Sequence, residues 1–139
     1  MVDQERVDRL LDRIASDLRE LESLAKLGTD LVGDRTALAA TKYYFITAIE
    51  GCARVAQHII ADRGWRIADS NADAVRRLGA EGVLTTELAE AVAKAVGFRN
   101  VLVHEYAEID NRRVVDNLHR LGDLHDFVTA IAQWMTSTG

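Results

Sequence analysis

Residues 35–62, RTALAATKYYFITAIEGCARVAQHIIAD, carry the clearest structural signal in the chain. Apolar residues recur in this segment at steps of three and four, the spacing that lines one face of an α-helix. Tyr44 and Ala53 extend the apolar surface to the other sides of the helix. We therefore predict a long helix that is the most buried element, with Asp34 as its N-terminal cap. Cys52 lies on the apolar stripe and is interpreted as a small buried hydrophobe, not as a reactive thiol.

Further helices are predicted on both sides of this segment. The helix before it has an apolar stripe wider than the seam of a coiled coil, which favours a bundle helix. Gly97 lies within a later helical pattern. A glycine inside a helix is ~1 kcal/mol less favourable than alanine, so the sequence does not decide whether that helix continues through Gly97. The predicted segments are a helix over residues 3–26, a loop over 63–70, a short helix from Asn71 or Ala72 to about Leu78 with Asn71 as its cap, a helix that begins after Thr85 or Thr86, and a last helix from Asp110 or Asn111.

This pattern predicts an all-α fold, an antiparallel four-helix bundle with an additional short helix between the second and third long ones. The sequence contains no proline, the residue that most sharply ends a helix. Its 139 residues, 48% hydrophobic and 28% charged, are typical of a globular protein and not of a disordered tail. We expect a single domain over residues 1–139.

The composition also excludes several classes of protein. One cysteine excludes an internal disulfide and agrees with the reducing cytoplasm. The charged N-terminal residues predict no signal peptide, and charges interrupt every apolar run before it reaches the length of a membrane span. The formal net charge of -5 disfavours a non-specific coat on nucleic acid but allows a local basic pocket. We expect a cytoplasmic protein that does not associate with membranes.

Residues 99–106, RNVLVHEY, concentrate the side chains that suit chemistry. If the segment is helical, Asn100 and His104 stand on the same face, whereas Arg99 lies roughly 140° from His104. The guanidinium of Arg99 matches phosphate oxygens, and the imidazole of His104 exchanges protons near neutrality. With Asn100 as an orienting group, the set suits attack by an RNA 2′-hydroxyl on a phosphodiester.

The spacing of these residues does not decide between this chemistry and a simpler interpretation. An arginine and a histidine five positions apart occur by chance in many helices, where Arg99 is a surface cation and His104 a satisfied ring at a helix end. The scheme requires no metal, and the four histidines show no convincing ligand spacing with acidic residues.

The octapeptide resembles the signature of HEPN-domain toxins of the HepT type. In that signature an arginine, often followed by a polar residue, precedes a histidine by five positions and a tyrosine by seven, as Arg99, Asn100, His104 and Tyr106 do. The resemblance extends over nearly the whole chain and includes the two long first helices, the region around Tyr43 and Glu50, and the loop at Trp65.

The resemblance implies a HEPN-like fold and a metal-independent endoribonuclease, without a cofactor, that is the toxin of a type VII-like toxin–antitoxin pair. Two chains would pair so that Arg99 of one works with His104 of the other, with Asn100 assisting. A minimal nucleotidyltransferase antitoxin would inactivate this homodimer by AMPylation of Tyr106, because a bulky anion there would repel an RNA backbone. Residue chemistry alone makes simple packing of Tyr106 beside the helix end equally acceptable.

Other polar residues carry weaker signals. Arg112 and Arg113 follow the motif and are candidate RNA contacts, although arginines near a helix start also serve solubility. The rival interpretation from another functional class is a non-catalytic helical module that binds a nucleotidyltransferase partner or a nucleotide. The remaining candidates are interpreted as a mixed solvated surface (Arg63, Arg66, Arg76, Arg77), as surface or edge histidines (His58, His119, His125) and as core or interface anchors (Trp65, Trp134).

Overall fold

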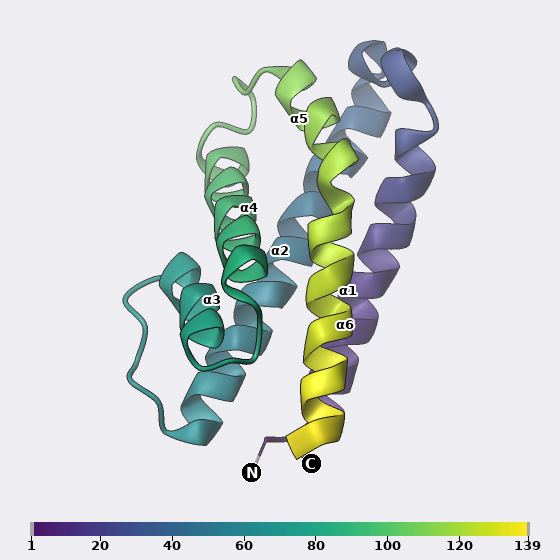
Figure 1. The fold of residues 1–139 in the computed structure, drawn as a ribbon. Helices are drawn as coiled ribbons and strands as arrows, with labels where there is room; N and C mark the ends of the chain where they lie inside the picture. The colour runs from purple at the N-terminus through teal and green to yellow at the C-terminus, as the bar shows by residue number, and fades with distance from the viewer. Residues whose placement is uncertain (1, 139) are drawn as a thin grey trace.

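The computed structural model describes residues 2–138, and its regular elements in that range are all helical. The elements are α1 (Gln4–Ala25), the 3₁₀ helix η1 (Gly28–Gly33), α2 (Arg35–Arg63), α3 (Asn71–Ala80), α4 (Thr86–His104), α5 (Asn111–Asn117), the 3₁₀ helix η2 (Leu118–Arg120) and α6 (Leu121–Thr138). The long helices α1, α2, α4 and α6 lie side by side and alternate in direction, and α3 packs beside α4 (Figure 1). The all-α fold with four long helices and a short one before the third is confirmed.

Helix α2 is the centre of the packing, as its sequence predicts. It contacts α1, α3, α4, α5 and α6, and its buried residues cover more than half of its circumference, while a side with Tyr43 and Arg54 remains exposed. The rings of Phe45 on α2 and Phe98 on α4 meet edge to face, with centroids 5.3 Å apart. Cys52 is fully buried on this helix, and burial raises the pKa of its thiol. The interpretation of Cys52 as a buried hydrophobe is confirmed.

Helices α1 and α2 approach each other closely because Gly51 has no side chain. A Cβ on Gly51 would lie 2.7 Å from Cγ1 of Ile14, closer than packed atoms allow. One polar contact lies in the same seam, where Thr47 Oγ1 donates a 2.6 Å hydrogen bond to the buried carboxylate of Asp17. Arg13 lies 3.7 Å from that carboxylate, but burial dominates and raises the pKa of Asp17.

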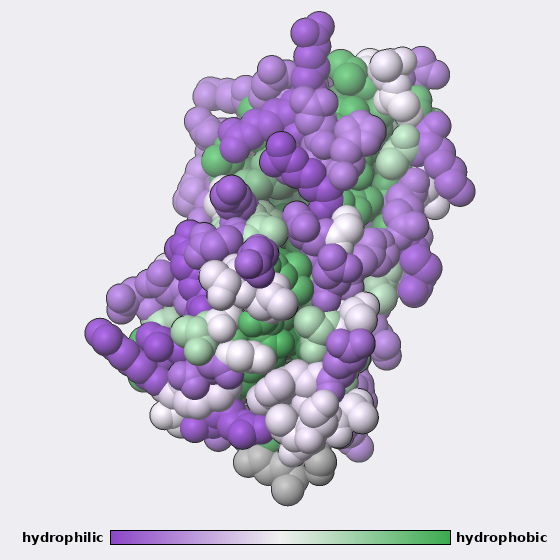
Figure 2. Space-filling view, viewed as in Figure 1, coloured by the Kyte–Doolittle hydropathy of each residue, from purple (hydrophilic) through white to green (hydrophobic). Residues whose placement is uncertain are grey.

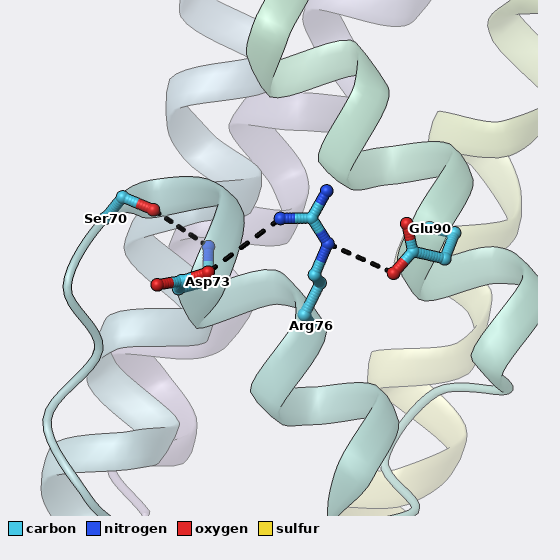
Figure 3. Close-up of polar contacts among 4 residues, drawn as sticks. All are labelled: Ser70, Asp73, Arg76 and Glu90. Carbon is cyan, nitrogen blue, oxygen red and sulfur yellow. Dashed lines mark hydrogen bonds and ion pairs between the residues drawn. The ribbon is translucent and has the colours of Figure 1, made fainter.

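Helix α3 is fixed to α4 by polar contacts at its exposed side and by close packing beneath them. Arg76 lies between Asp73 on its own helix, at 3.8 Å, and Glu90 on α4, at 3.0 Å (Figure 3). The cap of α3 is Ser70, whose Oγ accepts from the backbone N–H of Asp73, and the helix continues to Ala80. The predicted start at Asn71 is therefore confirmed, whereas the prediction of Asn71 as the cap is wrong by one residue and the end near Leu78 falls two residues short.

Two further boundaries differ from the expectation. Helix α4 passes through Gly97 without a break, since burial of the neighbouring Phe98 and of Leu102 outweighs the ~1 kcal/mol cost of a helical glycine. The predicted single last helix is instead α5, η2 and α6. The 3₁₀ turn covers Leu118–Arg120, and Leu118 at its start and Leu121 directly after it are both buried.

The caps of three helices follow the sequence closely. Side-chain oxygens of Asp34, Thr85 and Asp110 accept backbone hydrogen bonds at the starts of α2, α4 and α5. Over residues 2–138, no helix combines the length and the apolar character needed to cross a membrane.

Candidate active site

The motif residues lie at the C-terminal end of α4 and in the turn that follows. Phe98 and Leu102 are buried against the core, which fixes the rotation of α4 about its axis. This rotation turns Arg99 towards α2 and leaves Asn100 and His104 exposed. The helix ends at His104, and Tyr106 lies in the turn before α5.

Arg99 is held from two sides. Its Nη2 donates to the carboxylate of Glu50 on α2, and its Nη1 donates to Oδ1 of Asn100 at 3.0 Å. The arginine side chain is 22% exposed and that of Glu50 is 33% exposed, so the ion pair is shielded from solvent on most sides. Arg99 is thus a cation whose position is fixed before any substrate arrives.

Glu50 was not among the predicted site residues. Its contact with Arg99 spans 49 positions in the sequence, which no local spacing reveals. The available signal was a carboxylate on the most buried helix, since carboxylates in such places are usually paired.

Arg99 and Asn100 face two different cavities. Arg99 and Glu50 line a polar pocket of about 560 Å³ together with Arg54 and His58. Asn100 lines a larger hollow of about 1040 Å³ between α4, α5 and α6. On that face of the molecule, apolar residues show between polar side chains (Figure 2). The hydrogen bond between Arg99 and Asn100 therefore joins two surfaces of α4.

His104 is separate from Arg99 within the chain. It is exposed at the end of α4, and its ring makes no hydrogen bond or ion pair with any residue from 2 to 138. A free, solvated imidazole remains available to a substrate or to a second subunit. One chain does not bring the predicted catalytic pair into contact.

Tyr106 lies against α2 with its ring partly in solvent. Lys42 is buried on α2, its Nζ donates a 2.8 Å hydrogen bond to the carbonyl oxygen of Tyr106, and it lies 4.7 Å from the centroid of the Tyr106 ring. The tyrosine hydroxyl reaches the carbonyl oxygen of Ala39 only at 3.5 Å, and the residue is 42% exposed. Tyr106 is therefore both packed and accessible, so the structure agrees with either interpretation of it. Lys42, like Glu50, was not predicted.

The weaker candidates differ in their surroundings. Arg113 lines the hollow beside Asn100, and its guanidinium lies 5.9 Å from the ring centroid of Phe98. Arg112 is exposed at the start of α5, where its backbone N–H donates to the cap Asp110. His125 is exposed and pairs with Glu22 at 2.7 Å, and His58 is a half-buried edge residue that lines the pocket beside Arg99, so the interpretation of both as surface or edge histidines is confirmed. Within the described range, no group of three or more His, Cys, Asp or Glu side chains is arranged to hold a metal ion.

Comparison with known proteins identifies the family. Residues 7–131 match the family model described as HepT-like, "Ribonuclease HepT-like". The chain belongs to this HepT-like ribonuclease family. The matched range contains Arg99, Asn100, His104 and Tyr106.

Two curated proteins are similar in sequence to this HepT-like chain. An mRNA nuclease HepT from Shewanella oneidensis is 27% identical over 128 residues, 89% of this chain and 96% of that protein. A putative RNase from Archaeoglobus fulgidus is 32% identical over 81 residues, 57% of this chain and 59% of that protein. The first similarity therefore covers nearly the full length of both chains, whereas the second covers little more than half of each.

Solved structures share the HepT-like fold. The tri-AMPylated HEPN toxin of Shewanella oneidensis, solved with an MNT antitoxin, superposes with a TM-score of 0.87 at 23% identity over 94% of this chain and 99% of that one. YutE of Bacillus subtilis, a cytosolic protein of unknown function, superposes with a TM-score of 0.84 at 21% identity. The superposition covers 99% of this chain and 93% of that one. At these identities the structural likeness concerns the fold.

Proposed function

We propose that this HepT-like protein is a metal-independent endoribonuclease and the toxin of a type VII-like toxin–antitoxin pair in the cytoplasm. Family membership and the near full-length similarity to an mRNA nuclease support the reaction class. The observation that carries the proposal is a pre-positioned Arg99 cation on the same helix end as the free imidazole of His104.

In the proposed reaction His104 is the general acid and base. Its neutral imidazole takes the proton from a ribose 2′-hydroxyl, and the 2′-oxygen forms a bond to the adjacent phosphorus. The bond from phosphorus to the 5′-oxygen breaks, and that oxygen receives a proton from an imidazolium. The products are a 2′,3′-cyclic phosphate and a free 5′-hydroxyl. The exposure of His104 leaves its ring open to a strand of RNA.

Arg99 stabilises the charge that gathers on phosphorus during this transfer. Glu50 and Asn100 hold its guanidinium in advance, so the ordering of a long side chain is not required in the transition state. Asn100 thus assists catalysis by orientation and by joining Arg99 to the exposed face of α4.

The active form is proposed to be a homodimer. Arg99 and His104 make no contact with each other in one chain, and a two-fold axis near the end of α4 would bring Arg99 of one subunit to His104 of the other. This arrangement supplies a cation and a base from opposite sides of one strand.

Tyr106 is the proposed control point. The structure of a relative contains a tri-AMPylated HEPN toxin with an MNT antitoxin, and Tyr106 presents a partly exposed ring two residues from His104. AMPylation by a minimal nucleotidyltransferase antitoxin would place phosphate charge beside the base and repel RNA. Intact mass after incubation with this partner and ATP should rise by AMP units in the wild type and stay constant in Tyr106→Phe.

The test of the nuclease is cleavage of labelled single-stranded RNA in EDTA by the wild type, Arg99→Ala and His104→Ala. The wild type is expected to cut, and each variant to lose about 100-fold or more in rate, the usual contribution of a general base or a charge-stabilising group. Equal RNA decay in all three samples would reject the nuclease and leave a non-catalytic interaction module. If the wild type cuts RNA without EDTA but not in its presence, metal independence is rejected.

A further inference from the structure

A line of arginines borders the site along the seam of α1 and α2. Two adjoining pockets, of about 420 and 560 Å³, share Arg6, Glu50 and Arg54. We call the pair the arginine trough. The guanidinium-bearing residues that line it are Arg6, Arg9 and Arg13 on α1, Arg54 on α2 and Arg99 on α4.

The trough is basic although the chain is acidic. The formal net charge of the protein is -5, yet five arginines line the trough and Glu50 is its one acidic lining residue. Glu50 is itself paired with Arg99. In contrast, the larger hollow beside Asn100 mixes four basic lining residues with three acidic ones, and its Arg76 is paired with Glu90. Positive charge is therefore concentrated on one side of α4, the side that Arg99 faces.

Most of the positive charge in the trough is not neutralised by acidic side chains among residues 2–138. Among residues 2–138, the guanidinium groups of Arg6, Arg9 and Arg54 form no hydrogen bond or ion pair, and all three residues are exposed. Arg13 pairs with Asp17 only at 3.7 Å and is 61% exposed. Unpaired cations at this density repel one another, which an anionic ligand would relieve.

The spacing of these arginines fits an extended polyanion better than a single anion. Arg6, Arg9 and Arg13 recur at three and four positions, so each is about one helical turn, ~5 Å, from the next along one face of α1. Arg99, the cation assigned to the reacting phosphate, lines the second pocket and pairs with Glu50, which borders both pockets. In that second pocket Nε2 of His58 and Nε of Arg99 are buried without a hydrogen-bond partner among the described residues, and such atoms are rare in a folded protein.

We propose that the arginine trough binds the phosphate backbone of the RNA strand and leads it to Arg99. The inference rests on the proposed function for the position of the reacting phosphate. The new contacts are those of Arg6, Arg9 and Arg54, which sequence reasoning did not select; it selected Arg112 and Arg113 instead. The contacts are to phosphates, so the trough contributes affinity that depends on salt and little preference for base sequence.

The salt dependence of binding tests this proposal. A fluorescent single-stranded oligoribonucleotide is titrated with the full-length His104→Ala protein, which binds without cutting, at several KCl concentrations. The slope of log affinity against log salt should fall in magnitude by ~0.7 for each phosphate contact that is removed. When Arg6→Gln and Arg54→Gln are both added to the His104→Ala protein, the slope should therefore fall by ~1.4. The matched control is Arg66→Gln, an exposed arginine on the loop after α2, which should leave the slope unchanged.

The outcomes separate this inference from the proposed function. An unchanged slope in the double variant, with cleavage by the wild type intact, overturns the trough and leaves the nuclease standing. A reduced slope without any cleavage by the wild type supports the trough and rejects the nuclease. An unchanged slope together with weaker binding of the nucleotidyltransferase partner also overturns it, since the trough would then be a protein-docking surface. Circular dichroism melts of each variant test whether these exposed substitutions leave the fold intact.

Discussion

Replacing Glu50 tests whether the Arg99 cation is positioned before RNA binds. Glu50→Ala removes the carboxylate that receives Nη2, and leaves Asn100 as the remaining partner of the guanidinium among the described residues. Glu50→Gln keeps an oxygen acceptor at the same place and removes only the charge. The two variants therefore separate orientation from electrostatics.

The expected loss follows from side-chain entropy. A free arginine side chain gives up ~2 kcal/mol of rotamer freedom when it is ordered, and in Glu50→Ala part of this cost falls on the transition state. Since Asn100 still restrains one nitrogen, we expect a loss of ~1–2 kcal/mol, which corresponds to a roughly 5- to 30-fold lower single-turnover rate at saturating protein. In Glu50→Gln the rate should fall by less than ~3-fold, because the acceptor remains.

The assay is single-turnover cleavage of labelled RNA at saturating protein. Glu50→Ala should also destabilise the fold by ~1–3 kcal/mol, because the pair is mostly shielded from solvent and the substitution leaves the Arg99 cation without its carboxylate, so cleavage is measured well below the melting temperature of each variant. A thermal melt provides that control. A wild-type rate in Glu50→Ala would refute the positioning role of Glu50. Equal losses in both variants would show that the charge matters and the orientation does not.

Three further predictions concern Lys42 and the buried polar groups. Lys42→Met removes a charge-assisted hydrogen bond worth ~1.5–3 kcal/mol from the turn at Tyr106, so amide exchange over residues 105–110 should accelerate; exchange as slow as in the wild type would show that Lys42 does not anchor this turn. Burial raises the pKa of Asp17, so the folded protein holds this proton more tightly than the unfolded chain, and stability falls as pH rises from 3.8 through the raised pKa. Urea titrations should therefore show Asp17→Asn gaining stability relative to the wild type over that rise, and a pH-independent difference would contradict the assignment. Cys52 is fully buried with a raised thiol pKa, so iodoacetamide should modify it only after unfolding, and modification of the native protein would place it elsewhere.

The helices follow from the sequence where local chemistry specifies them. The apolar stripes of α1 and α2 and the caps Asp34, Thr85 and Asp110 require only neighbouring residues, so these elements are predicted to within one or two positions. The 3₁₀ turn η2 interrupts the last helix although the apolar spacing continues through Leu118, Leu121 and Leu124, so helical periodicity alone does not predict the break.

The candidate site likewise has a part that the sequence predicts and a part that only the fold reveals. Arg99, Asn100, His104 and Tyr106 lie within eight consecutive residues and share a recognisable motif. Their partners Glu50 and Lys42 lie on α2, 49 and 64 positions from the residues that they hold, and only the fold reveals them. The unpaired arginines of α1 are likewise ordinary helix-surface residues until α2 and α4 are placed beside them.

If Arg99 and His104 of different subunits act on one RNA strand, the two inactive variants should restore cleavage when they are mixed. Arg99→Ala and His104→Ala are each purified, combined in equal amounts, and allowed to exchange subunits, with native mass spectrometry to verify the mixed dimer. Half of the dimers then contain one complete site out of two, so the account predicts that activity returns to about a quarter of the wild-type level. Mixed dimers that form and cut no RNA would contradict it.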